Sequence, residues 1–227
     1  MKLTKFAFLI CTFCLAFTAV KSQDKLSAKI DASAKVLKDF VAMKENIPQQ
    51  LLEITQGIIV IPKLLNAGFV VGGKRGRGIA VVKREDGSWT DPVFITLTGG
   101  SIGFQIGVQS VDLVLIFKDR ETLEKIGKGS FTLGGDASVT AGPVGRNSSA
   151  STDYKLEAEV YSYSRSKGLF AGISISGSAL DVDSKSNQAF YGTETDAKTI
   201  FSEESKKQST SIASLKQALK DMYVTVK

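Results

Sequence analysis

Apolar residues at helical spacing predict a helix near each end of the chain. From Leu26 to Met43 they recur every three or four positions, and Lys29, Lys35 and Lys38 fall elsewhere on the surface. This is typical of an amphipathic helix, which either packs on the core or lies on a membrane surface. Residues 205–223 predict a C-terminal helix with an apolar stripe of Ile212, Leu215, Leu219 and Met222.

Between these helices, short runs rich in β-branched residues and glycine predict strands. The expected strands cover residues 57–61, 68–71, 79–83, 89–97, 101–110, 111–117, 131–141, 154–164 and 168–182, and residues 187–192 close the β-rich part. Short helices are expected at 49–55 and 119–126. The pattern predicts an α+β fold: a β-rich single domain whose curved antiparallel sheet closes into a barrel or sandwich, flanked by helices.

The most basic stretch, residues 54–84, contains no acidic residue and a local charge of +6, from Lys63, Lys74, Arg75, Arg77, Lys83 and Arg84. Four glycines between Val71 and Ile79 predict a tight cationic turn between two strands. Such a turn either keeps a hairpin tip soluble or presents charge to an anionic surface. The segment lacks the order of a phosphate-binding loop, although its amides and cations could hold a lipid phosphate or a carboxylate.

The first 22 residues predict a secretory signal peptide. Lys2 and Lys5 precede an apolar run over residues 6–20, and cleavage is expected before Gln23. The residues before the two cysteines lack the Leu-small-small pattern of a lipoprotein signal, which leaves lipidation as the weaker alternative. The protein is therefore expected to be exported, to the periplasm or beyond, with one domain over 23–227. Removing 1–22 changes the balance from 29 basic and 23 acidic residues to 26 and 23, or +3, which argues against general nucleic-acid binding.

Residues 23–227 contain neither cysteine nor histidine, because Cys11 and Cys14 both precede them. This composition excludes disulfides, cysteine or histidine metal ligands, cysteine nucleophiles and serine–histidine–aspartate catalysis. No cofactor is expected. Asp112 lies inside an apolar run and needs a partner if it is buried, for which a basic residue is a candidate.

A series of motifs in order resembles the SYLF lipid-binding domain family over about residues 28–195, with a C-terminal helix at about 205–223. The longest are AGPVGR at 141–146 and YSRSKGLFAG at 163–172; shorter ones include GRG at 76–78, DGSW at 86–89, GFQIG at 103–107 and FYG at 190–192. The resemblance implies a non-enzymatic domain. Eukaryotic members are associated with phosphoinositide membranes, through a basic amphipathic N-terminal helix and an adjoining positive surface, and some bind actin filaments.

The resemblance carries over residue by residue to candidate lipid contacts. On the helix these are Lys35, Lys38 and Phe40, although Asp31 and Ala32 stand where a lysine-rich helix would have more charge. Elsewhere the candidates are Lys74, Arg75, Arg77, Arg165 and Lys167. Arg165 has a structural alternative, an ion pair with Asp112. Trp89 and Phe94 are expected in the core.

Two functions follow from this reading of the residues. The first is binding to an anionic lipid or membrane surface, and the alternative is a structural or adaptor role through another protein of the cell envelope. Export would separate the domain from cytoplasmic actin, so the sequence argues against an actin role.

Overall fold

The computed structural model describes residues 23–43, 47–129, 131–142, 156–167, 169–171, 173–192, 195–202 and 207–224. The expected signal peptide and most of the AGPVGR motif lie outside these ranges.

Seven strands form one curled sheet, β1 (Gly57–Val82), β2 (Val93–Phe117), β3 (Phe131–Thr132), β4 (Val139–Ala141), β5 (Val160–Ser166), β6 (Leu169–Phe170) and β7 (Ser178–Val182). Their order is β3-β7-β2-β5-β4, with β1 paired to β2 and β6 to β5. All pairings are antiparallel except β4 with β5. The expected α+β fold with a curved sheet is confirmed, and this parallel pair is its one departure from an antiparallel sheet among the described residues.

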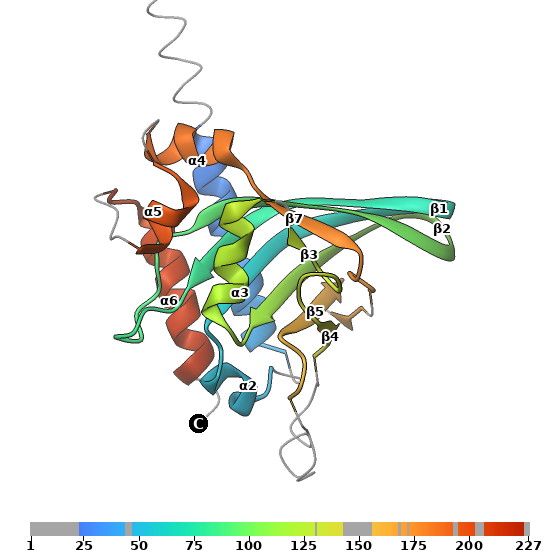
Figure 1. The fold of residues 1–227 in the computed structure, drawn as a ribbon, viewed down its shortest axis with the longest axis horizontal. Helices are drawn as coiled ribbons and strands as arrows, with labels where there is room; N and C mark the ends of the chain where they lie inside the picture. Colours follow the sequence, from blue (N-terminus) through green and yellow to red (C-terminus); the bar gives the residue numbers. More distant parts are fainter. Residues whose placement is uncertain are drawn as a thin grey trace, which may run out of the picture.

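The long strands β1 and β2 form a ribbon that dominates the sheet. Figure 1 shows both strands running away from the helices to a tip and doubling back. At the other end of the ribbon a turn joins them, in which the Arg84 amide donates to the Ser88 carbonyl (2.7 Å) and Gly87 has φ 81°. Two strand-like runs on either side of Asp86-Gly87 predict such a hairpin turn, and the structure confirms it. The strands predicted as separate pieces are instead continuous.

The glycine-rich segment between Val71 and Ile79 is not a turn, so that prediction was wrong. Its residues pair in register with β2, from Gly72 opposite Ser101 to Gly78 opposite Ile95. Gly76 and Gly78 serve close packing instead, because the two halves of β1 lie against each other there. A Cβ at Gly78 would lie 2.0 Å from the carbonyl oxygen of Val60, and only glycine fits there.

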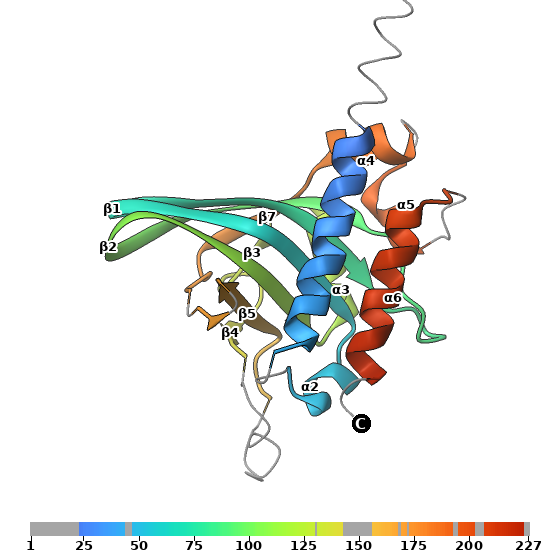
Figure 2. The same cartoon turned by 180° about the vertical axis from the view of Figure 1, so that it is seen from behind.

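Six helices surround the sheet: residues 23–41, α2 (Gln49–Glu53), α3 (Arg120–Glu124), α4 (Ser184–Tyr191), α5 (Ala197–Ser202) and α6 (Thr210–Val224), counting only described residues; a 3₁₀ turn, η1 (Lys125–Lys128), follows α3. Figure 2 shows the N-terminal helix beside α6 across one face of the sheet, which we call the helix face. Both terminal helices and the short helices near 50 and 120 were predicted. Residues 187–192 were expected to close the β-rich part and lie mostly in α4, where Asp183 caps the first turn.

The sheet has an apolar core on each face. On the helix face, Ile58 and Val60 pack with the N-terminal helix and α6, as do Trp89 and Phe94, which confirms their core assignment. On the opposite face, Ile59 and Ile61 pack with α3, α5 and β3. Alternate residues of β1 therefore serve different cores, as expected for a strand buried on both sides.

The apolar stripe of the N-terminal helix is part of the helix-face core. Ile30, Leu37 and Phe40 are almost completely buried there. Of the two interpretations of this helix, the structure supports packing on the core. Within the described part of the chain, no helix is long and apolar enough to cross a membrane.

Candidate functional site

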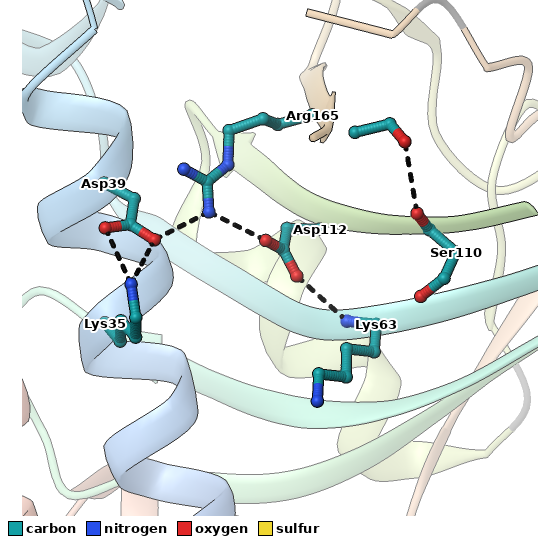
Figure 3. Close-up of polar contacts among 7 residues, drawn as sticks. Lys35, Asp39, Lys63, Ser110, Asp112 and Arg165 are labelled. Carbon is teal, nitrogen blue, oxygen red and sulfur yellow. Dashed lines mark hydrogen bonds and ion pairs between the residues drawn. The ribbon is translucent and has the colours of Figure 1, made fainter. Parts of the chain in front are cut away.

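Arg165 connects the N-terminal helix to the sheet. Strands β2 and β5 place Asp112 directly opposite Arg165, and the Arg165 Nη2 lies 2.9 Å from Asp112 Oδ2 and 2.7 Å from Asp39 Oδ2 (Figure 3). The guanidinium also lies 5.7 Å from the centre of the Phe40 ring. The ion pair between Arg165 and Asp112 is therefore present, and Asp112 has the basic partner that its position required. Arg165 and Phe40 are therefore engaged inside the protein, and little of either side chain is exposed.

The charges in this cluster stabilise one another. Burial alone would raise the pKa of Asp39, but hydrogen bonds and positive charge from Lys35 and Arg165 hold that pKa below its ordinary value. Burial likewise opposes the charge of Arg165, and its bonds to Asp112 and Asp39 raise its pKa. Arg165 therefore stays charged, and the helix is held by a charge-assisted pair.

Asp112 also organises an irregularity in β1. Its second oxygen, Oδ1, accepts a hydrogen bond from the Lys63 backbone amide at 3.1 Å. Lys63 has φ 54°, a left-handed conformation that is unusual for a lysine, and it lies where β1 has one residue more than β2 between Ile61 and Leu64. This bulge changes which residues of β1 face the helices.

Lys74 lies on the opposite face from its neighbours Arg75 and Arg77. Its side chain is buried, with 7% exposed, and its ammonium donates to the Ser174 carbonyl oxygen. Burial lowers the pKa of Lys74. The prediction that Lys74 contacts lipid does not fit this position, because its charge is already bonded inside the protein.

Arg75 and Arg77 are exposed on the helix face, since they alternate in step with Ile79 and Val81 of the helix-face core. The Arg77 side chain is 64% exposed, and its Nε lies 3.8 Å from Asp183 Oδ2. Lys29 lies close by. Burial, followed by the positive charges of Arg77 and Lys63, lowers its pKa. Lys29, Lys63 and Arg77 thus form one basic region. The sequence did not predict this region, because the direction of the Lys63 side chain depends on the bulge.

The remaining predicted contacts, Lys35, Lys38 and Lys167, are exposed. Lys35 pairs with Asp39 at 2.8 Å, and Lys167 has φ 50° between β5 and β6. Lipid binding by any of the eight candidates stays a prediction. The structure leaves five of them accessible and brings Arg75 and Arg77 together on one face.

The described residues offer little support for metal binding or for a ligand pocket. They contain no group of three or more acidic, cysteine or histidine side chains placed to hold a metal ion. A shallow pocket of about 570 Å³ at the start of α6 is lined by Asp91, Lys207 and Lys216, among others. Asp91 there is paired with Lys216 at 2.7 Å, so its charge is satisfied internally.

Comparisons with known proteins identify relatives of this chain. Residues 98–222 match the family model "Ysc84: Las17-binding protein actin regulator". LAS seventeen-binding protein 3 of Saccharomyces cerevisiae is 36% identical over 187 residues, covering 81% of this chain and 40% of that protein. SH3 domain-containing YSC84-like protein 1 of Homo sapiens is 34% identical over 173 residues, covering 73% and 50%.

The chain therefore belongs to the Ysc84 family, whose shared domain is the SYLF domain, and the resemblance is confirmed. The matched part of this chain covers 40% of the length of the yeast relative and 50% of the length of the human relative. The family match also reaches into α6, beyond the range covered by the motifs.

Proposed function

We propose that this chain is a non-catalytic module that binds the surface of anionic membranes. The observation that carries the proposal is the charge of the ribbon. β1 contains Lys63, Lys74, Arg75 and Arg77 and no acidic residue, while the one acidic residue of β2, Asp112, is paired with Arg165. Of the four cations, all except Lys74 are exposed. The exposed three, Lys63, Arg75 and Arg77, are not balanced by any acidic residue of the ribbon, although Arg77 lies 3.8 Å from Asp183 before α4.

Binding of this kind depends on charge. Basic residues near an anionic bilayer contribute about 1 kcal/mol each, and salt screens that attraction within a Debye length. The N-terminal helix contributes little apolar surface to binding, because its stripe is buried in the core. We therefore expect reversible attachment that weakens as salt is raised.

Co-sedimentation of residues 23–227 with vesicles tests the proposal. The protein should sediment with phosphatidylcholine vesicles only when phosphatidylserine is included, and less in high salt. Arg75→Glu/Arg77→Glu should weaken binding at least about thirtyfold, because two favourable contributions of about 1 kcal/mol are lost. Lys198→Glu/Lys220→Glu makes the same change in net charge at exposed positions on α5 and α6, and should have a much smaller effect. Equal losses in the two variants, or binding indifferent to salt, would contradict the proposal.

The proposal includes export. The pattern of residues 1–22 supports removal of a signal peptide, and the N-terminus of the protein recovered outside the cytoplasm should be Gln23 by mass spectrometry. An intact N-terminus on protein retained in the cytoplasm would overturn this part. If the protein is exported, its ligand is an anionic lipid or glycolipid of the envelope, and contact with cytoplasmic actin does not arise.

A second candidate function is binding of a protein partner, as in a cell-envelope adaptor. The family description and the yeast relative's name, both of which refer to binding Las17, favour it. Affinity capture with residues 23–227 tests it. Recovery of one partner in stoichiometric amount, together with no retention on anionic vesicles, would favour this function over lipid binding.

A further inference from the structure

Two large apolar side chains are exposed on the ribbon, close to where it doubles back. Leu65 is 50% exposed and Val108 is 74% exposed. Leu65 on β1 pairs with Ser110 on β2, and Ala67 on β1 pairs with Val108 on β2. Leu65 and Val108 therefore lie diagonally across the two strands, in pairs two residues apart. We call residues 63–68 and 107–111 the distal ribbon.

Both side chains lie on the helix face. Leu64 and its partner Val111 are buried in the opposite core, so the following residue, Leu65, points the other way. Val108 keeps step with Asp112 and with Val114, which packs in the helix-face core. The distal ribbon therefore continues the helix face past the N-terminal helix (Figure 2).

Cations lie on the same face of the ribbon as these apolar residues. Lys63 is two residues from Leu65, and Arg75 and Arg77 lie on the same face in the second half of β1, which packs against the first half. The distal ribbon itself contains no Asp or Glu. Exposed apolar side chains bordered by Lys and Arg are what an element needs to lie in the headgroup layer of an anionic bilayer, with apolar groups in the acyl boundary and cations at the phosphates. An acidic protein would satisfy the cations but not require the apolar pair to protrude beyond the fold.

We infer that the distal ribbon is the part of this protein that enters an anionic bilayer, with Leu65 and Val108 leading, while the N-terminal helix stays packed on the sheet. This inference rests on the proposed membrane binding. It assigns penetration to β-structure and to residues outside the predicted lipid-binding set.

Site-directed fluorescence tests this, because residues 23–227 contain no cysteine and a single introduced cysteine takes an environment-sensitive label uniquely. Leu65→Cys and Val108→Cys probe the distal ribbon. Ala28→Cys probes the N-terminal helix and Ala213→Cys probes α6, and all four residues are exposed. On phosphatidylserine-containing vesicles, the label at 65 and 108 should shift to the blue and be quenched by lipids with nitroxide on the acyl chain. The label at 28 and 213 should do neither.

The outcomes separate the inference from the proposed function. Absence of vesicle binding by the unlabelled protein would end both. Vesicle binding with no response at 65 and 108, or with a response at 28, would overturn only the inference. If the label at 108 responded to soluble polyglutamate as strongly as to phosphatidylserine-containing vesicles, the distal ribbon would be a site for acidic polymers. That result would also overturn the inference.

A paired substitution gives an independent readout. Leu65→Ser/Val108→Ser should weaken vesicle binding about tenfold, from the lost burial of apolar groups. It should leave the thermal midpoint unchanged, since both side chains are exposed. Retention of full vesicle affinity by this variant would count against penetration even if charge reversal at Arg75 and Arg77 abolishes binding.

Discussion

At the scale of single residues, Gly78 has a defined structural requirement. A Cβ there would meet the Val60 carbonyl oxygen at 2.0 Å and the Ile61 Cα at 2.9 Å, and neither backbone atom can move without disturbing the strand. Gly78→Ala should therefore lower the free energy of unfolding by about 1–3 kcal/mol or more, as overpacking does. Urea denaturation measures this. Gly100→Ala is the control, because a Cβ at Gly100 has nothing within 4 Å, and equal effects would contradict the packing.

Lys74 is a predicted lipid contact that the structure shows buried, so its substitution tests which of the two positions matters. Because its ammonium is bonded to the Ser174 carbonyl inside the protein, Lys74→Met should change vesicle affinity far less than Arg75→Met, its exposed neighbour. Both variants lose one charge, so they are matched. Co-sedimentation across a lipid titration measures the difference. A larger loss with Lys74→Met would mean that Lys74 leaves its buried position to bind lipid.

At the scale of elements, the contact between the N-terminal helix and the sheet should respond to pH through Asp39. Lys35 and Arg165 hold the pKa of Asp39 below its ordinary value, so its contribution is present above the unfolded pKa of about 3.9 and is lost as pH falls through the lower folded pKa. Asp39→Asn should therefore be less stable than the parent protein at pH 7. The gap should close as pH falls through the lowered folded pKa of Asp39. Urea unfolding of both proteins at each pH measures it, and a gap independent of pH would refute the role of the charge.

The elements also show what the sequence could and could not predict. Helical spacing located the N-terminal helix and α6, and the Asp-Gly pair located the turn between β1 and β2, because these signals are local. The conformation of the glycine-rich segment between Val71 and Ile79 is not determined by neighbouring residues in the sequence. Gly76 and Gly78 are set by contact with Val60, Ile61 and Leu64, which approach only when the ribbon doubles back.

The candidate site was predictable in composition but not in orientation. The excess of basic residues in 54–84 is visible in the sequence. Which of them face outward depends on alternation within a strand that was expected to be a turn, and on the bulge at Lys63, which reverses the pattern for the rest of β1. Lys74 was therefore grouped with Arg75 and Arg77 although it points the other way, and Leu65 and Val108 were not selected.

At the scale of the whole molecule, the two cores determine how the protein can meet a membrane. Withdrawing the N-terminal helix would expose Ile30, Leu37 and Phe40, together with the sheet residues beneath them, and would break the Arg165–Asp39 pair. Burying a side chain of this size contributes about 1.5–3 kcal/mol, so release of the helix would cost most of the stability of an ordinary domain. The distal ribbon can enter the headgroup layer without any such loss.

Hydrogen exchange should therefore show binding without unfolding. On phosphatidylserine-containing vesicles, the amides of residues 30–40 should keep the slow exchange of the free protein, while those of the distal ribbon should exchange more slowly than in solution. Mass spectrometry of peptides from the free and vesicle-bound protein measures both. Faster exchange in residues 30–40 on vesicles would show that the helix leaves the sheet to bind lipid, and the cores would then have to be able to open at the membrane.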